Sequence, residues 1–86
     1  MGRAILGARR LMTDQELLRD IGAALYGPHW HAALAHDLDV SWRTMRRWIA
    51  GEAVPPRVWG ELKELLSARM LLFERAIEAL RRLKPP

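Results

Sequence analysis

The sequence contains no cysteine, and this absence excludes disulfide bonds and thiolate zinc sites as sources of stability. It also has no apolar run close to the roughly 20 residues that a transmembrane helix needs. No carboxylate pair, nucleophile–base set or glycine-rich phosphate loop is visible, and His29, His31 and His36 lack the spacing of a metal site. We therefore expect a cytoplasmic protein that is not an enzyme, has no metal or cofactor and does not enter a membrane.

Length and charge set the next limits. A chain of 86 residues forms one domain at most, and because half of its residues are apolar it can build a small core. Domains of this size bury only about 60% of their unfolded surface, so association with another copy is the expected source of further burial. The formal net charge of +4 favours a polyanion or an acidic surface as the partner.

Residues 1–12 carry Arg3, Arg9 and Arg10 and no acidic residue. Two interpretations of this segment stay open. It is either a flexible basic arm that reaches along DNA, or a frayed terminus without a role of its own. The expected domain organisation is therefore an arm over residues 1–12 and one folded domain over residues 13–86.

The first clear helix is expected over residues 13–25. Thr13 is a good N-cap, and Glu16 completes a capping box with it. Gly22 weakens the helix but allows another backbone to approach closely. Apolar residues that recur at the helical repeat mark the expected core face: Leu17, Leu18, Ile21, Ala24 and Leu25.

Two short helices are expected over residues 31–38 and 42–50, joined by a tight turn. Asp39 suits the turn because aspartate tolerates the left-handed conformation better than most residues. Ser41 is the expected N-cap of the second helix, and Gly51 is its expected stop. At about 100° per residue, the second helix has an apolar face and a basic face on opposite sides. The apolar face is formed by Met45, Trp48 and Ile49, and the opposite face by Arg43, Arg46, Arg47 and Ala50.

A long helix is expected over residues 57–83, which completes an all-α fold of about four helices. Such a helix would be about 40 Å long, whereas a three-helix body is only about 25 Å across. Its second half would therefore remain in water unless another copy covers it. The expected dimerisation residues in that half are Met70, Phe73, Ile77 and Leu80.

Residues 31–51 carry a recognisable pattern of small and apolar residues. Alanine stands at the fifth position, apolar residues stand at the fourth and eighth, and others follow the turn and line the second helix: Ala35, Leu34, Leu38, Val40, Met45 and Trp48. This pattern resembles the helix-turn-helix of the Cro/repressor-like family of phage and bacterial transcription regulators. Two positions depart from the family, since Asp39 replaces the usual glycine of the turn and His31 replaces the usual glutamine at the first position.

The resemblance implies that the helix over residues 42–50 enters the major groove of double-stranded DNA while the preceding helix crosses the backbone. Arginine forks suit the O6 and N7 atoms of guanine. Two alternatives remain: the arginines form an ordinary solvated surface, and Trp42 pads a helix interface. The expected DNA-binding residues are His31, Ser41, Trp42, Arg43, Thr44, Arg46 and Arg47.

The function that this resemblance implies is a homodimeric, sequence-specific repressor that controls its own small operon in a phage or mobile element. The alternative function is a protein-interaction module, or an antitoxin-type protein, that binds a partner protein through the long C-terminal helix.

Overall fold

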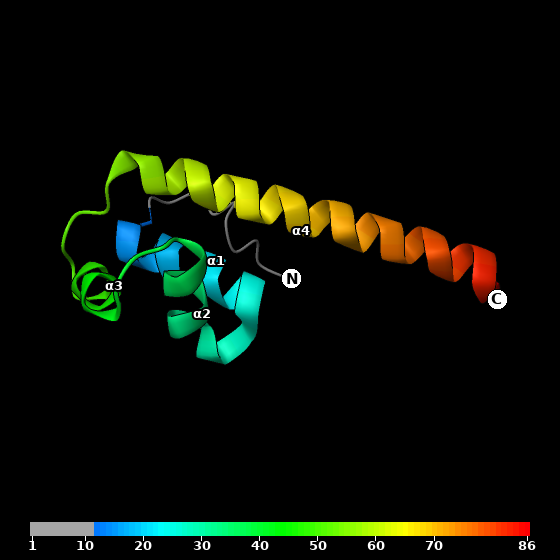
Figure 1. Cartoon of the computed structure of the whole chain (residues 1–86), viewed down its shortest axis with the longest axis horizontal. Helices are drawn as coiled ribbons and strands as arrows, with labels where there is room; N and C mark the ends of the chain where they lie inside the picture. The colour runs from blue at the N-terminus through cyan, green and yellow to red at the C-terminus, as the bar shows by residue number, and fades with distance from the viewer. Residues whose placement is uncertain (1–11) are drawn as a thin grey trace.

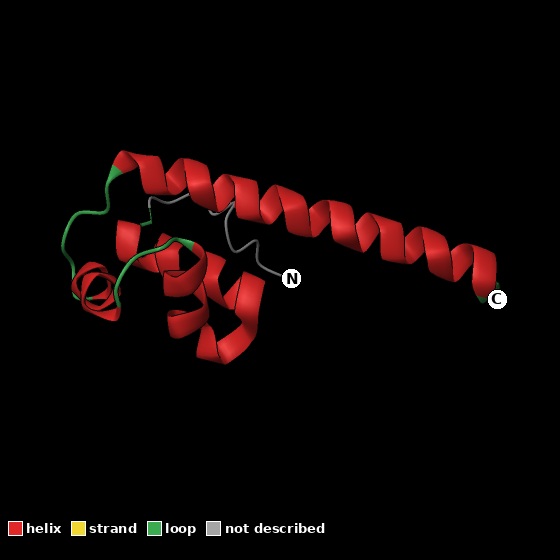
Figure 2. Ribbon diagram, in the orientation of Figure 1, coloured by secondary structure: helices red, strands yellow, loops and turns green. Residues whose placement is uncertain are grey.

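The computed structural model describes residues 12–86, and this part of the chain consists of helices and turns without a strand (Figure 1 and Figure 2). The expected all-α fold with a long C-terminal helix is confirmed, and every expected helix end lies within one residue of the observed end. The expected basic arm, residues 1–12, lies outside the described residues except for Met12. In chain order the elements are α1 (Asp14–Tyr26), the 3-10 turn η1 (Gly27–His29), α2 (Trp30–Asp37), α3 (Trp42–Ile49) and α4 (Pro56–Leu83).

The start of α1 is a capping box, as the sequence predicts. The Glu16 N–H donates to Oγ1 of Thr13 at 3.1 Å, and the Thr13 N–H donates to Oε1 of Glu16 at 3.0 Å. These bonds satisfy two backbone donors that a helix start leaves without partners. The beginning of α1 is therefore determined by residues within its own first turn.

The turn between α2 and α3 is closed by two backbone hydrogen bonds around Asp39. The Asp39 N–H donates to the His36 carbonyl at 3.0 Å, and the Val40 N–H donates to the Ala35 carbonyl at 3.0 Å. Asp39 has a φ of 57°, so it occupies the left-handed position of a Schellman helix end. The left-handed turn expected at Asp39 is confirmed. Because the two bonds hold the chain as it leaves α2, they set the direction of α3, which Figure 1 shows nearly end on.

The core gathers side chains from all four helices, but its boundary on α1 differs from the prediction. Ala24 is exposed, whereas Gly22 is buried. The ring of Trp30 packs directly over Gly22, so the buried face of α1 is rotated toward the glycine and away from Ala24. The close approach expected at Gly22 thus comes from an indole ring and not from a backbone. The buried core residues are Leu18, Ile21, Leu25, Trp30, Leu34, Ala35, Leu38, Met45, Trp48, Val54, Val58 and Leu62.

The first half of α4 packs on the body, where Val58 and Leu62 are fully buried. This contact ends at Arg69, whose Nη1 donates to the Leu25 carbonyl at 2.7 Å and whose guanidinium lies 5.3 Å from the ring centroid of Tyr26. The Tyr26 hydroxyl in turn donates a hydrogen bond to the Asp37 carboxylate. Side chains from α1, α2 and α4 therefore meet at one point, and α4 leaves the body there.

The second half of α4 extends beyond the other helices (Figure 1). Every residue from Met70 to the C-terminus is exposed, including large apolar side chains that are 48–75% accessible. The expectation that half of this helix lies free of the body is confirmed. Despite its length, α4 is too polar to cross a lipid bilayer, and the shorter helices of residues 12–86 do not qualify either.

Alanine substitutions at two helical glycines should have opposite effects on stability. A Cβ atom at Gly22 would lie 2.3 Å from Cε3 of Trp30, whereas a Cβ atom at Gly60 meets nothing within 4 Å. Gly22→Ala should lower the free energy of unfolding by about 1–3 kcal/mol, because the core must shift to admit the methyl group. Gly60→Ala should raise it by about 0.5–1 kcal/mol, because alanine favours the helix. Urea denaturation at one fixed protein concentration measures both changes, and stabilisation by both substitutions would contradict the packing at Trp30.

The phenol of Tyr26 should ionise at a higher pH than an ordinary tyrosine. Because Tyr26 is the only tyrosine in the sequence, its titration can be followed alone. Burial, followed by the hydrogen bond to Asp37 and its charge, raises the pKa of Tyr26 to about 12. The unfolded-state pKa is about 10. This contribution to stability is therefore complete below pH ~10 and is lost as the pH rises toward the folded-state pKa.

The absorbance of the phenolate measures this pKa directly. Asp37→Asn should move the titration midpoint only part of the way back, because burial, the largest cause, remains. A native midpoint near the unfolded value would show that Tyr26 is neither buried nor bonded to Asp37 in solution.

Candidate nucleic-acid interface

The two faces of α3 are arranged as the sequence predicts. Met45 is fully buried and Trp48 is 3% exposed, and both belong to the core. Arg43, Arg46 and Arg47 are exposed. Because the buried and exposed residues alternate at the helical repeat, burial of the first set forces the second set toward solvent. Ile49, also expected on the apolar face, is partly buried against the core.

The exposed face of α3 is hollowed. Trp42, the three arginines and Ala50 line one shallow depression with a volume of about 500 Å³. Trp42 is 49% exposed, so about half of this residue is open to water. Both interpretations of Trp42 therefore stay open, since the other half of the residue is covered. The depression combines guanidinium groups with one apolar ring, over residues 42–50.

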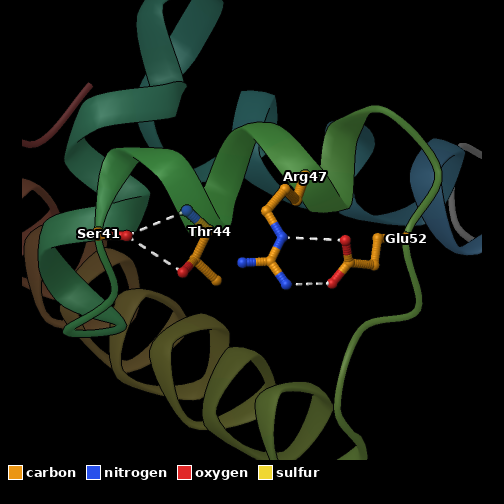
Figure 3. A network of polar contacts seen from close by, with 4 residues as sticks. All are labelled: Ser41, Thr44, Arg47 and Glu52. Atoms are coloured by element: carbon orange, nitrogen blue, oxygen red, sulfur yellow. Dashed lines mark hydrogen bonds and ion pairs between the residues drawn. The ribbon is translucent and has the colours of Figure 1, made fainter.

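Ser41 and Thr44 organise the start of α3 (Figure 3). The Thr44 N–H donates to Oγ of Ser41 at 3.0 Å, and the Ser41 hydroxyl donates to Oγ1 of Thr44 at 3.1 Å. The hydroxyl of Ser41 is thus committed to capping, and the hydroxyl proton of Thr44 remains available to a ligand. The backbone N–H groups of Trp42 and Arg43 lie in the first turn, where an α-helix provides no acceptor for them. The N-cap expected at Ser41 is confirmed, and Thr44 is the better donor toward a phosphate.

His31 lies at the second position of α2, one residue further into the helix than expected. Its ring stacks on Trp30 with centroids 4.0 Å apart, and it meets Trp42 edge to face at 5.8 Å. The start of α2 and the start of α3 are therefore joined through His31. The fold brings the predicted site residues His31 and Trp42 together at one end of the basic depression.

Glu52 belongs to this surface, although the sequence pattern did not point to it. Its carboxylate accepts hydrogen bonds from Nε of Arg47 at 2.9 Å and from Nη2 of Arg47 at 2.7 Å (Figure 3). Hydrogen bonding from Arg47 lowers the pKa of the Glu52 carboxyl, and the same bonds raise the pKa of Arg47. The pair is therefore ionised at neutral and mildly acidic pH. The one available signal was an acidic residue directly after the helix-stopping Gly51.

Acidic side chains of the body gather elsewhere. Asp37, Glu61 and Glu64 line a separate depression beside α4, in which Arg57 forms an ion pair with Glu61 at 2.9 Å. Residues 12–86 contain no group of three or more histidine, aspartate and glutamate side chains arranged to hold a metal ion. The basic depression on α3 and this acidic depression are lined by different residues, so Glu52 is the acidic side chain that lies beside the α3 arginines.

Comparison of the chain with protein-family models, with curated proteins and with solved structures gave no match. A function for this chain therefore rests on the chemistry of the residues on the α3 surface.

Proposed function

We propose that this protein is a sequence-specific DNA-binding transcription regulator whose recognition helix is α3. The observation that carries the proposal is the pairing of a firmly buried face, Met45 and Trp48, with an exposed face of three arginines. The major groove of B-DNA is about 12 Å wide and admits one α-helix. A short helix held from behind by the core can enter the groove as a rigid unit and present its arginines to base edges.

The residues around α3 suit contacts with the DNA backbone. Phosphate groups favour helix N-termini, where free N–H groups and the helix dipole attract negative charge. Thr44 and the first-turn N–H groups of α3 would bind one phosphate, and His31, which contacts Trp42, would lie beside a neighbouring phosphate. Trp42, which is half exposed, would contact a thymine methyl group or the sugar wall. In this arrangement Arg43, Arg46 and Arg47 would lie over the bases.

A second copy of this chain is the proposed occupant of the exposed half of α4. Met70, Phe73, Ile77 and Leu80 follow one another at steps of three and four, which is the spacing of a helix-pairing seam. All four side chains are 48–63% exposed. The opposite side is charged, with Glu78 paired to Arg81 at 3.5 Å and to Arg82 at 3.7 Å. Pairing two copies along this seam would bury the apolar side and leave the charged side in water.

A homodimer would present two copies of α3 to a two-fold symmetric operator, with half-sites about one helical turn apart. A Cro/repressor-like regulator of this size fits autorepression of a small phage or mobile-element operon, and such a role requires a cytoplasmic location. The same exposed half of α4 supports a second candidate function, in which it binds a different protein, as an antitoxin does.

Removal of single arginines from α3 should weaken specific binding without unfolding the protein. A duplex selected by the wild-type protein from a random library provides the ligand. Arg43→Ala and Arg46→Ala should each weaken its binding about 5-fold to 150-fold, because a bidentate arginine–guanine pair contributes about 1–3 kcal/mol of discrimination. The melting temperature should not fall, because both side chains are exposed. Fluorescence anisotropy measures affinity, and circular dichroism measures melting.

Arg75→Ala is the matched control, because it removes the same charge from α4 and leaves α3 intact. Wild-type affinity should also fall with salt, by about 0.9 in log K per log salt for each phosphate contact. The regulator proposal fails if both α3 variants bind the selected duplex as the wild type does, or if no duplex is enriched.

Polar substitution in the α4 seam should separate the two copies. Phe73→Gln and Ile77→Gln should convert a dimer into a monomer, measured by sedimentation equilibrium, because each removes an apolar contact at the seam. Leu71→Gln is the control, since Leu71 is 48% exposed but lies on the charged side of α4. If the wild-type protein sediments as a monomer, the proposed homodimer is wrong. The candidate function in which the exposed half of α4 binds a different protein would then remain.

A further inference from the structure

The end of α3 has a geometry that carries Glu52 back to the helix. Gly51 has a φ of 120°, its N–H donates to the Trp48 carbonyl at 3.0 Å, and the Glu52 N–H donates to the Arg47 carbonyl at 2.9 Å. These are the two hydrogen bonds of a Schellman helix end, with glycine at the position that needs a positive φ. The backbone of Glu52 is thus bonded to the backbone of Arg47. Their side chains lie together because of this turn, although five residues along a helix would not share a face.

The carboxylate of Glu52 occupies one particular edge of the guanidinium. A guanidinium has five N–H donors, and Glu52 accepts one from Nε and one from Nη2. The remaining edge, formed by Nη1 and the second N–H of Nη2, keeps two parallel donors. Figure 3 shows Nη1 pointing away from Glu52, on the side of Thr44. This free edge is the fork that matches the O6 and N7 acceptors of guanine in the major groove.

We propose that Glu52 is a positioning residue that holds Arg47 for bidentate recognition of a guanine, so that the Arg47–Glu52 pair determines specificity. The proposal rests on the DNA-binding function proposed above. Within residues 12–86, Arg43 and Arg46 form no ion pair or side-chain hydrogen bond. Their side chains suit phosphates as well as bases, whereas the two hydrogen bonds to Glu52 favour one orientation of Arg47 in the free protein.

Charge strengthens the same assignment. The Arg47–Glu52 pair has no net charge, so it gains little from the phosphate backbone alone. The carboxylate would also be repelled by phosphates, which disfavours every pose except the one with the free guanidinium edge on a base. Glu52 therefore lowers affinity for random DNA and raises affinity for the correct site, and both effects increase the ratio between them.

The test compares wild-type protein with Glu52→Ala, Glu52→Gln and Arg47→Ala, each as the full chain. Glu61→Ala is the matched control, because Glu61 makes a similar exposed pair with Arg57 on α4. Each variant is titrated with the selected duplex and with a scrambled duplex of equal length. Single guanines of the selected duplex are then replaced by 7-deazaguanine, which lacks the N7 acceptor and keeps normal base pairing.

We expect Glu52→Ala to lower the ratio of specific to random affinity by about tenfold, with tighter binding to the scrambled duplex. Glu52→Gln, which keeps one acceptor oxygen, should fall between wild type and Glu52→Ala. One guanine should be sensitive to the loss of N7 in the wild type and in Glu61→Ala. The same guanine should be insensitive in Arg47→Ala and weakly sensitive in Glu52→Ala.

Three results would overturn the proposal. The first is that Glu52→Ala raises affinity for both duplexes by the same factor, which would show that Glu52 acts only through its negative charge and does not position Arg47. The second is that the N7-sensitive guanine remains sensitive in Arg47→Ala, which would assign it to another side chain. Both leave the regulator function intact. The third is that wild-type protein shows no preference among duplexes, and this result alone overturns the proposed function together with the role of Glu52.

Discussion

Burial of Met45 and Trp48 is the constraint on which the rest of the molecule depends. A helix of eight residues is not stable alone in water, so α3 exists because these two side chains complete the core. The same burial determines which side of α3 faces solvent, because residues three and four apart share a face. The arginine surface is thus a consequence of packing, and a rigid core behind it gives the surface a defined shape.

Asp39 follows α2 and Gly51 follows α3, and both have a positive φ. The two turns have different structural roles. Asp39 closes α2 with two backbone bonds and aims the chain into α3. Gly51 closes α3 with the same pattern of bonds and returns Glu52 to the side of Arg47. The first turn positions the helix as a body, and the second positions one side chain on it. Together they explain how a surface made of long, flexible arginines acquires local order.

The two halves of α4 have different surroundings, and Arg69 lies where they divide. Up to Arg69 the helix completes the core, and beyond it the apolar residues have no cover from their own body. Domains of this size are marginal, so a second copy on the outer half would add burial that one chain cannot supply. Stability and the proposed DNA binding would then both depend on protein concentration, since association favours the folded, paired state.

The sequence by itself determined the helices, their ends and the two faces of α3, because caps, stops and periodicity act within a few residues. Thr13, Ser41 and Asp39 could be assigned from neighbours along the chain. Only the tertiary structure decided that Gly22, and not Ala24, faces the core, because the indole of Trp30 arrives from another element. It also decided the Arg69–Leu25 bond across 44 residues. Such contacts depend on where separate elements and turns meet in space, and no local pattern encodes that position.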